Sequence, residues 1–126
     1  MIMDWQDYMK QLSPHLRELR VGTPDGMKSF SAMAQASLKT NALDTKTKEL
    51  IALAIGVATR CDDCSAFHTK AAIDQGASRE EVMETLGLAI YMGAGPSVMY
   101  ASHAVEAFEQ IKAAKDAANA AAPAED

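Results

Sequence analysis

The sequence predicts a helix over residues 45–59 that is apolar around nearly its whole circumference. Aliphatic side chains occur there at neighbouring positions as well as three and four residues apart: Leu50, Ile51, Leu53, Ile55 and Val57. A helix with so little polar surface has to be covered on several sides. In a chain of 126 residues, this pattern predicts either a central helix or a helix at a subunit interface.

Two further helices are predicted before this segment. The first begins after Asp4 as N-cap and ends at Gly22, with Pro14 as a potential break inside it. The second runs from about Pro24 to Asn41, since Thr23-Pro24 supplies an N-cap followed by proline at the first helical position. Its apolar residues recur at helical spacing and predict one buried face: Met27, Phe30, Met33, Ala34 and Leu38.

The remaining sequence is also helical in pattern. A fourth helix is expected from the Cys61–Cys64 region to Gly76, and the Ser78/Glu81 capping box opens a fifth helix that stops at 93–96. A last helix follows, and residues 118–126 form a small-residue tail that we expect to be disordered. No segment alternates apolar and polar residues, so we predict an all-α fold of about six helices in one domain, residues 1–117.

Charge and hydropathy exclude several classes of partner. The net charge is -5 and the 12 basic residues are scattered, so a nucleic-acid partner is not expected. The apolar run 86–101 is shorter than a bilayer span and contains glycines and a proline, so no membrane partner is expected either. The N-terminus lacks the pattern of a secretory signal, and we therefore expect a cytoplasmic location.

The two cysteines of the chain, Cys61 and Cys64, are separated by two residues. Because cytoplasmic thiols are kept reduced, such a pair indicates redox chemistry or metal binding more than a structural disulfide. The reactive species is the thiolate, which a helix N-terminus and a basic neighbour both favour. His68 follows Cys64 by one helical turn, so Cys64 is the cysteine with a base beside it.

Glu49 joins this group if the chain reverses near Arg60. Along one continuous helix Glu49 would be too far from the cysteines, but in an antiparallel hairpin it lies opposite residues 68–72. Glu49, His68 and Cys64 would then form a proton relay, in which the carboxylate orients the imidazole.

The spacing Glu49, Cys61-x-x-Cys64, His68, followed by the turn 76–81, resembles the alkylhydroperoxidase D-like branch of the carboxymuconolactone decarboxylase family. The resemblance covers residues 27–109 and implies an all-helical fold that assembles as a homotrimer or a trimer-based homohexamer. The redox branch reduces peroxides through the dithiol, and we expect no cofactor for this chain. The decarboxylase branch lacks the cysteine pair, so its activity is not implied.

The resemblance also implies a role for each site residue. Cys64 would attack the peroxide, Cys61 would resolve the product, and Glu49 with His68 would relay protons. The substrate would be a peroxide or a small disulfide, and a dithiol or lipoyl-type donor would return the electrons. Asp63 departs from the best-known peroxidase, which has histidine before its second cysteine.

Other interpretations remain open on the residues alone. Cys61, Cys64 and His68 are possible metal ligands, with Asp62, Asp63, Glu49 or His103 as a fourth. The pair could also serve a non-enzymatic redox sensor or interaction module, or have no chemical role. We interpret His103 as a packed or surface residue of the last helix, although it could border a pocket together with Tyr100.

Overall fold

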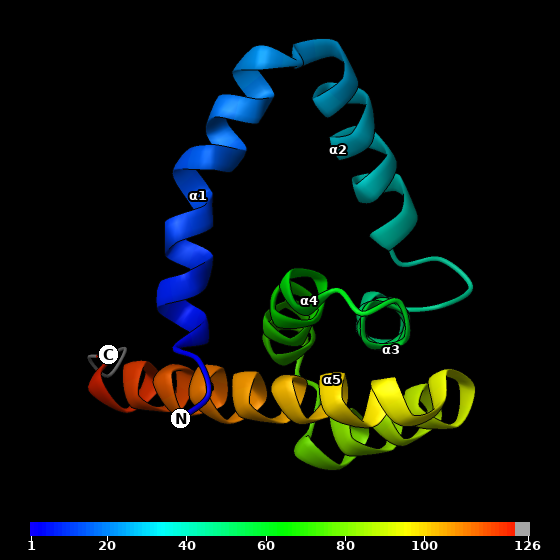
Figure 1. Ribbon diagram of the computed structural model, residues 1–126. Helices are drawn as coiled ribbons and strands as arrows, with labels where there is room; N and C mark the ends of the chain where they lie inside the picture. Colours follow the sequence, from blue (N-terminus) through cyan, green and yellow to red (C-terminus); the bar gives the residue numbers. More distant parts are fainter. Residues whose placement is uncertain (123–126) are drawn as a thin grey trace.

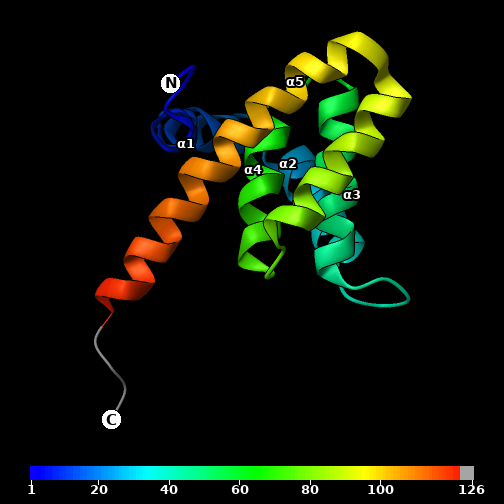
Figure 2. The same cartoon turned by 90° about the horizontal axis from the view of Figure 1, so that it is seen from below.

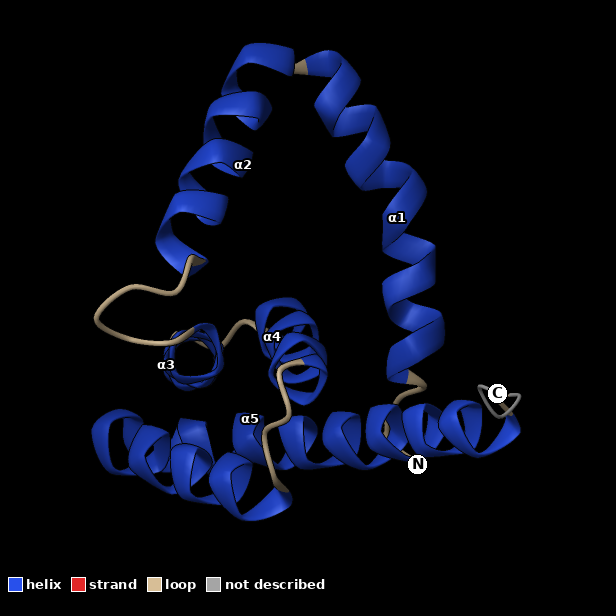
Figure 3. Cartoon of the chain, turned by 180° about the vertical axis from the view of Figure 1, so that it is seen from behind, coloured by secondary structure: helices blue, strands red, loops and turns tan. Residues whose placement is uncertain are grey.

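The computed structural model of the chain describes residues 1–122 and contains five α-helices. These are α1 (Trp5–Gly22), α2 (Pro24–Leu38), α3 (Thr45–Ala58), α4 (Asp62–Asp74) and α5 (Arg79–Ala121) (Figure 1). Residues 1–122 contain no β-strand, so the predicted all-α class is confirmed (Figure 3). None of the helices in this described range has the length and apolar composition that a membrane span requires.

The predicted helix starts are confirmed by their capping bonds. Asp4 caps α1 by accepting a hydrogen bond from the Asp7 amide at 3.0 Å, and Asp44 caps α3 in the same way. The predicted capping box opens α5, because Ser78 and Glu81 each bond the backbone amide of the other. Local sequence therefore determines where these helices begin.

The helix α5 reverses direction at Ala94, so that its two arms lie beside each other (Figure 2). Ala94 has φ 61° and ψ -152°, which is a glycine-like conformation for a residue with a side chain. The bend lies within residues 93–96, where the sequence predicts the fifth helix to stop, so the two arms of α5 are the expected fifth and sixth helices. At Gly93, a Cβ atom would overlap the Ser97 hydroxyl, so a side chain there would require Ser97 to move.

The structure differs from the sequence prediction at Pro14 and in the C-terminal tail. The potential break at Pro14 was wrong, because α1 continues through this residue to Gly22. Residues 118–121 of the expected disordered tail belong to α5, and residues 123–126 lie outside the described residues.

The core lies where α3, α4 and α5 pack against one another, and the start of α1 is anchored to it (Figures 1 and 2). Its buried side chains come from all four helices: Trp5, Leu53, Val57, Ala66, Val82, Leu86, Phe108 and Ile111. The Trp5 indole N–H also donates to Glu106 at 3.1 Å, which fixes the first turn of α1 against α5. This arrangement holds the N-terminus of α4 between α1, α3 and α5.

The helix α2 has no buried residue in the single chain. The prediction that one face of this helix is buried was therefore wrong for the single chain. Phe30 and Met33 are 66% and 67% exposed on the arm that α1 and α2 form above the other helices (Figure 1). The helix α3 is buried at Leu53 and Val57 but exposes 45% of Ile51 and 57% of Ile55. The chain thus carries apolar faces that its own fold leaves uncovered.

Candidate redox site

A sharp turn between α3 and α4 brings the predicted site residues together. Arg60 adopts φ 62°, a left-handed conformation, and the Cys61 amide donates back to the Gly56 carbonyl at 2.9 Å. The two helices consequently pack side by side, as the hairpin interpretation required. Glu49 in α3 lies opposite His68 in α4.

Glu49 and His68 form a short hydrogen bond, with 2.6 Å between Glu49 Oε2 and His68 Nδ1. The Glu49 side chain is 5% exposed, whereas about a third of the His68 side chain reaches solvent. With Glu49 as the accepting carboxylate, Nδ1 would donate in this bond, and Nε2 would be the nitrogen left to exchange protons with another group. The predicted Glu49–His68 contact is therefore confirmed.

The two cysteines are joined as a disulfide, with an S–S distance of 2.07 Å. Cys61 is the N-cap of α4, and its sulfur accepts a hydrogen bond from the Cys64 amide at 3.2 Å. Cys64 is exposed and Cys61 is half-buried. A peroxide or a thiol arriving from solvent therefore reaches Cys64 more easily than Cys61.

Cys64 and His68 line one pocket of about 270 Å³ together with residues of α3 and its C-cap: Ala52, Ile55, Gly56 and Thr59. Gly56 is what permits this close packing. A Cβ atom there would lie 3.2 Å from Cys64 Cβ and 3.3 Å from the Ser65 hydroxyl. The pocket thus combines an exposed cysteine and an oriented imidazole with mostly apolar walls.

The candidate metal ligands near the cysteines do not form a cluster within the described residues. Among residues 1–122, no group of three or more His, Cys, Asp and Glu side chains gathers closely enough to hold a metal ion. The sulfurs that would serve as ligands are bonded to each other instead.

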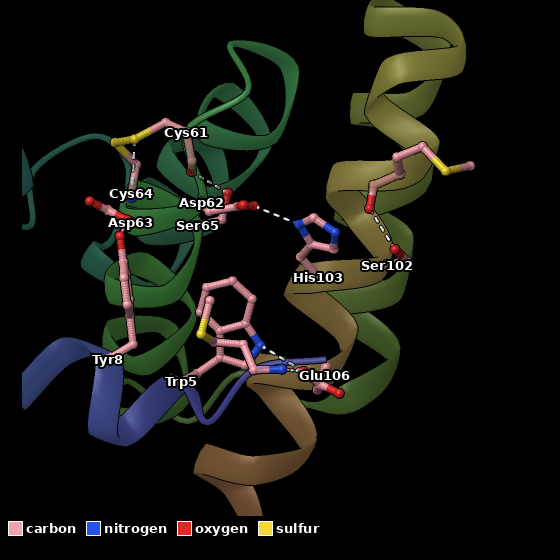
Figure 4. Close-up of polar contacts among 12 residues, drawn as sticks. Trp5, Tyr8, Cys61, Asp62, Asp63, Cys64, Ser65, Ser102, His103 and Glu106 are labelled. Atoms are coloured by element: carbon pink, nitrogen blue, oxygen red, sulfur yellow. Dashed lines mark hydrogen bonds and ion pairs between the residues drawn. A yellow bond between two sulfur atoms is a disulfide. The ribbon is translucent and has the colours of Figure 1, made fainter. Parts of the chain in front are cut away.

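The two residues between the cysteines are each held by a different helix (Figure 4). The Tyr8 hydroxyl of α1 donates to Asp63 at 2.5 Å, and His103 Nδ1 of α5 lies 2.9 Å from Asp62 Oδ1. The hydrogen bond to Asp63 is the main cause that raises the pKa of Tyr8, so the hydroxyl stays protonated as a donor. Asp63, which stands where the best-known peroxidase has histidine, is thus hydrogen-bonded to α1.

Sequence reasoning missed both of these contacts. Tyr8 and Asp63 are 55 residues apart, and Asp62 and His103 are 41 residues apart, so no local pattern connects them. His103 is packed, as we interpreted it, with its ring 5.5 Å from that of Tyr100 and 6.1 Å from that of Trp5. Its bond to Asp62 also places it beside the cysteine turn.

Comparison with known families and proteins gives consistent matches. The model of the carboxymuconolactone decarboxylase family matches residues 24–107. An uncharacterised protein of Cupriavidus necator is 35% identical over 113 residues, which is 90% of this chain and the whole of that protein. An uncharacterised protein of Haemophilus influenzae is 37% identical over the same length and coverage.

Solved structures show the same fold. A carboxymuconolactone decarboxylase family protein from Legionella pneumophila, in its apo form, is 48% identical with a TM-score of 0.82, covering 85% of this chain and 96% of that one. A family protein from Thermotoga maritima is 28% identical with a TM-score of 0.80, covering 88% of this chain and 95% of that one. The Thermotoga protein has been suggested to take part in the antioxidative response.

Proposed function

The chain belongs to the carboxymuconolactone decarboxylase family, and from this membership and the site geometry we propose that it is a thiol-dependent peroxidase or disulfide oxidoreductase. In this proposal Cys64 is the attacking cysteine, Cys61 the resolving cysteine, and Glu49 and His68 the proton relay. The observation that carries the proposal is that His68, which bonds Glu49 at 2.6 Å, lines one pocket together with the exposed Cys64. The suggested antioxidative role of the Thermotoga protein agrees with it.

The proposed cycle begins with the reduced pair. The Cys64 thiolate attacks one peroxide oxygen, so that an S–O bond forms, the O–O bond breaks, and an alcohol leaves after protonation. The Cys61 thiolate then attacks the Cys64 sulfur, which forms the disulfide and releases water. One peroxide is reduced by two electrons, and the dithiol is oxidised.

A second dithiol closes the cycle by exchange. Its thiolate attacks the Cys61–Cys64 disulfide, a mixed disulfide forms, and its second thiol displaces the protein thiol. The donor leaves as a disulfide and both cysteines are reduced again. By the family resemblance, a lipoyl-type dithiol is the donor class to test first.

The relay supplies and removes protons in both half-reactions. His68 Nε2 accepts the Cys64 thiol proton, directly or through water, and can return a proton to the leaving alkoxide. Glu49 holds the ring by Nδ1 and stabilises the imidazolium that forms. A buried carboxylate suits this role, because water competes little for its oxygens.

The test is peroxide consumption by the purified protein with alkyl hydroperoxides, hydrogen peroxide and a panel of dithiols that includes dihydrolipoamide. We expect turnover in the wild type, its loss in Cys64→Ser, and the loss of two free thiols per chain on oxidation. Full activity of Cys64→Ser would refute the proposal.

A non-enzymatic redox sensor is the second candidate, favoured by the uncovered apolar faces of α2 and α3. Oxidation would then change binding or assembly without catalytic turnover. Partner binding that depends on the redox state, in a protein that consumes no peroxide with any donor, would support the sensor instead.

We also propose that the chain is a homotrimer or homohexamer. A groove of about 510 Å³ between α3 and α5 is lined by apolar side chains such as Ile51, Ile55, Leu88 and Met92, and α2 exposes Phe30 and Met33. Large exposed apolar patches mark interaction surfaces, and further copies of the chain are the occupants that we propose. Light scattering after size-exclusion chromatography measures the number of chains in the assembly. A cytoplasmic location is also part of the proposal.

A further inference from the structure

The segment between the two cysteines consists of Asp62 and Asp63, and side chains from outside α4 bond both of them. Tyr8 reaches Asp63 from α1, and His103 reaches Asp62 from α5 (Figure 4). The two donors approach from different helices. Together they fix the turn that connects the two cysteines.

The donors are themselves held by aromatic packing. The Trp5 ring lies 5.9 Å from the Tyr8 ring, edge to face, and 6.1 Å from the His103 ring. Trp5 is buried and its indole N–H bonds Glu106. Tyr8 and His103 therefore share one buried support and can hold the turn in a constant position.

This support matters most when the disulfide is open. In the oxidised protein the S–S bond already restricts the turn, whereas in the reduced protein other contacts must do so. Within α4 the turn keeps the bond from the Ser65 hydroxyl to the Cys61 carbonyl at 2.9 Å. The bonds to Tyr8 and His103 add two restraints from outside the helix.

We propose that Tyr8 and His103 are positioning residues for the redox pair: through Asp63 and Asp62 they keep the two reduced thiols in disulfide-forming geometry. Without them the reduced turn gains conformations in which the sulfurs are apart, and the reduced form becomes more favourable relative to the disulfide. The proposal rests on the redox cycle described above. Its measured quantity, the equilibrium between dithiol and disulfide, does not depend on peroxide turnover.

The experiment equilibrates the full-length protein with reduced and oxidised glutathione and counts free thiols by alkylation. Two glutathione thiols reduce the Cys61–Cys64 disulfide, giving two protein thiols and one glutathione disulfide, so two electrons are exchanged. The variants Tyr8→Phe and His103→Phe keep an aromatic ring in place and remove only the donor. Tyr91→Phe and His15→Phe make the same changes at exposed positions that contact neither Asp62 nor Asp63.

We expect each donor variant to shift the equilibrium toward the dithiol by roughly two- to tenfold, the range of a single hydrogen bond. A tenfold shift corresponds to about 30 mV for this two-electron couple. The control variants should match the wild type. Equal melting losses in the oxidised and reduced forms, with an unchanged equilibrium, would mean that the bonds are merely structural and would overturn the proposal.

Two variants of Asp62 separate the hydrogen bond from the charge. Asp62→Asn keeps an oxygen that accepts from His103, and Asp62→Ala removes it. We expect a shift in the alanine variant and little change in the asparagine variant; equal shifts in both would overturn the positioning role. If the wild type consumes no peroxide but the donor variants still shift the equilibrium, the proposed function fails and the positioning role holds.

Discussion

Replacing Gly56 with alanine would place a methyl group between α3 and the first turn of α4. The new Cβ would lie 3.2 Å from Cys64 Cβ, 3.3 Å from Ser65 Oγ and 3.4 Å from the Ser65 amide nitrogen. These separations are a few tenths of an ångström shorter than comfortable carbon contacts, which begin near 3.5 Å. The methyl group therefore fits only if the start of α4 moves away from α3.

Two opposing contributions decide the size of the effect. Alanine gains up to about 1 kcal/mol over glycine inside a helix. Overpacking a tight contact costs about 1–3 kcal/mol. Two of the three neighbours, Cys64 Cβ and the Ser65 amide nitrogen, belong to a turn that the disulfide fixes, so they yield little in the oxidised protein. We expect Gly56→Ala to lower the free energy of unfolding of the oxidised form by about 1 kcal/mol.

The reduced form should tolerate the methyl group better, because its turn can move. Urea unfolding of both redox forms at one fixed protein concentration measures the two penalties. Gly87→Ala is the matched control, since Gly87 also lies inside a helix but has no atom within 4 Å of a Cβ built on it. That variant should gain about 0.5–1 kcal/mol. If Gly56→Ala is as stabilising as Gly87→Ala in the oxidised form, the reasoning about this contact is wrong.

Three further predictions concern the relay, acid stability and the bend of α5. Glu49→Gln should reduce kcat/KM for peroxide by roughly 100-fold with the fold retained. The control Glu18→Gln, which alters an exposed histidine–glutamate pair, should have no effect. Equal activities of the two variants would exclude the relay. The hydrogen bond from Lys46 holds the pKa of Glu81 below its ordinary value of 4.5, so its contribution to stability is complete above that pH and is lost as the pH falls through the lowered pKa. As the pH is lowered from about 6 to about 3, the melting temperature of Glu81→Gln should therefore fall less than that of the wild type. Parallel curves of melting temperature against pH would contradict this. Ala94→Gly should raise the free energy of unfolding by about 1 kcal/mol in urea titrations by relieving the φ of 61°, and an unchanged value would mean that Ala94 is not strained.

Local chemistry explains which parts of the fold could be predicted. The capping residues Asp4, Asp44 and Ser78 act within one turn of their own position, and sequence alone located those helix starts. The Glu49–His68 contact was predictable because one reversal at a known place fixes which residues face each other across a hairpin.

The buried face of α2 and the contacts between distant segments could not be predicted, for a different physical reason. The apolar stripe of α2 correctly indicates a face that avoids water, but periodicity does not say whether the same chain or another molecule covers it. The bonds of Tyr8 and His103 to the cysteine turn depend on how α1 and α5 approach α4. Such contacts between distant segments leave no spacing pattern in a sequence.

The short separation of the cysteines has a consequence for the unfolded chain. A disulfide stabilises a protein largely by restricting the disorder of its unfolded state, and the effect grows with the loop that it closes. The Cys61–Cys64 bridge spans a separation of three residues, for which the loop entropy amounts to about 2 kcal/mol, compared with about 4.7 kcal/mol for a hundred-residue loop. Opening the bridge thus costs the folded chain less than half of the loop entropy that a bridge across a hundred residues would withdraw.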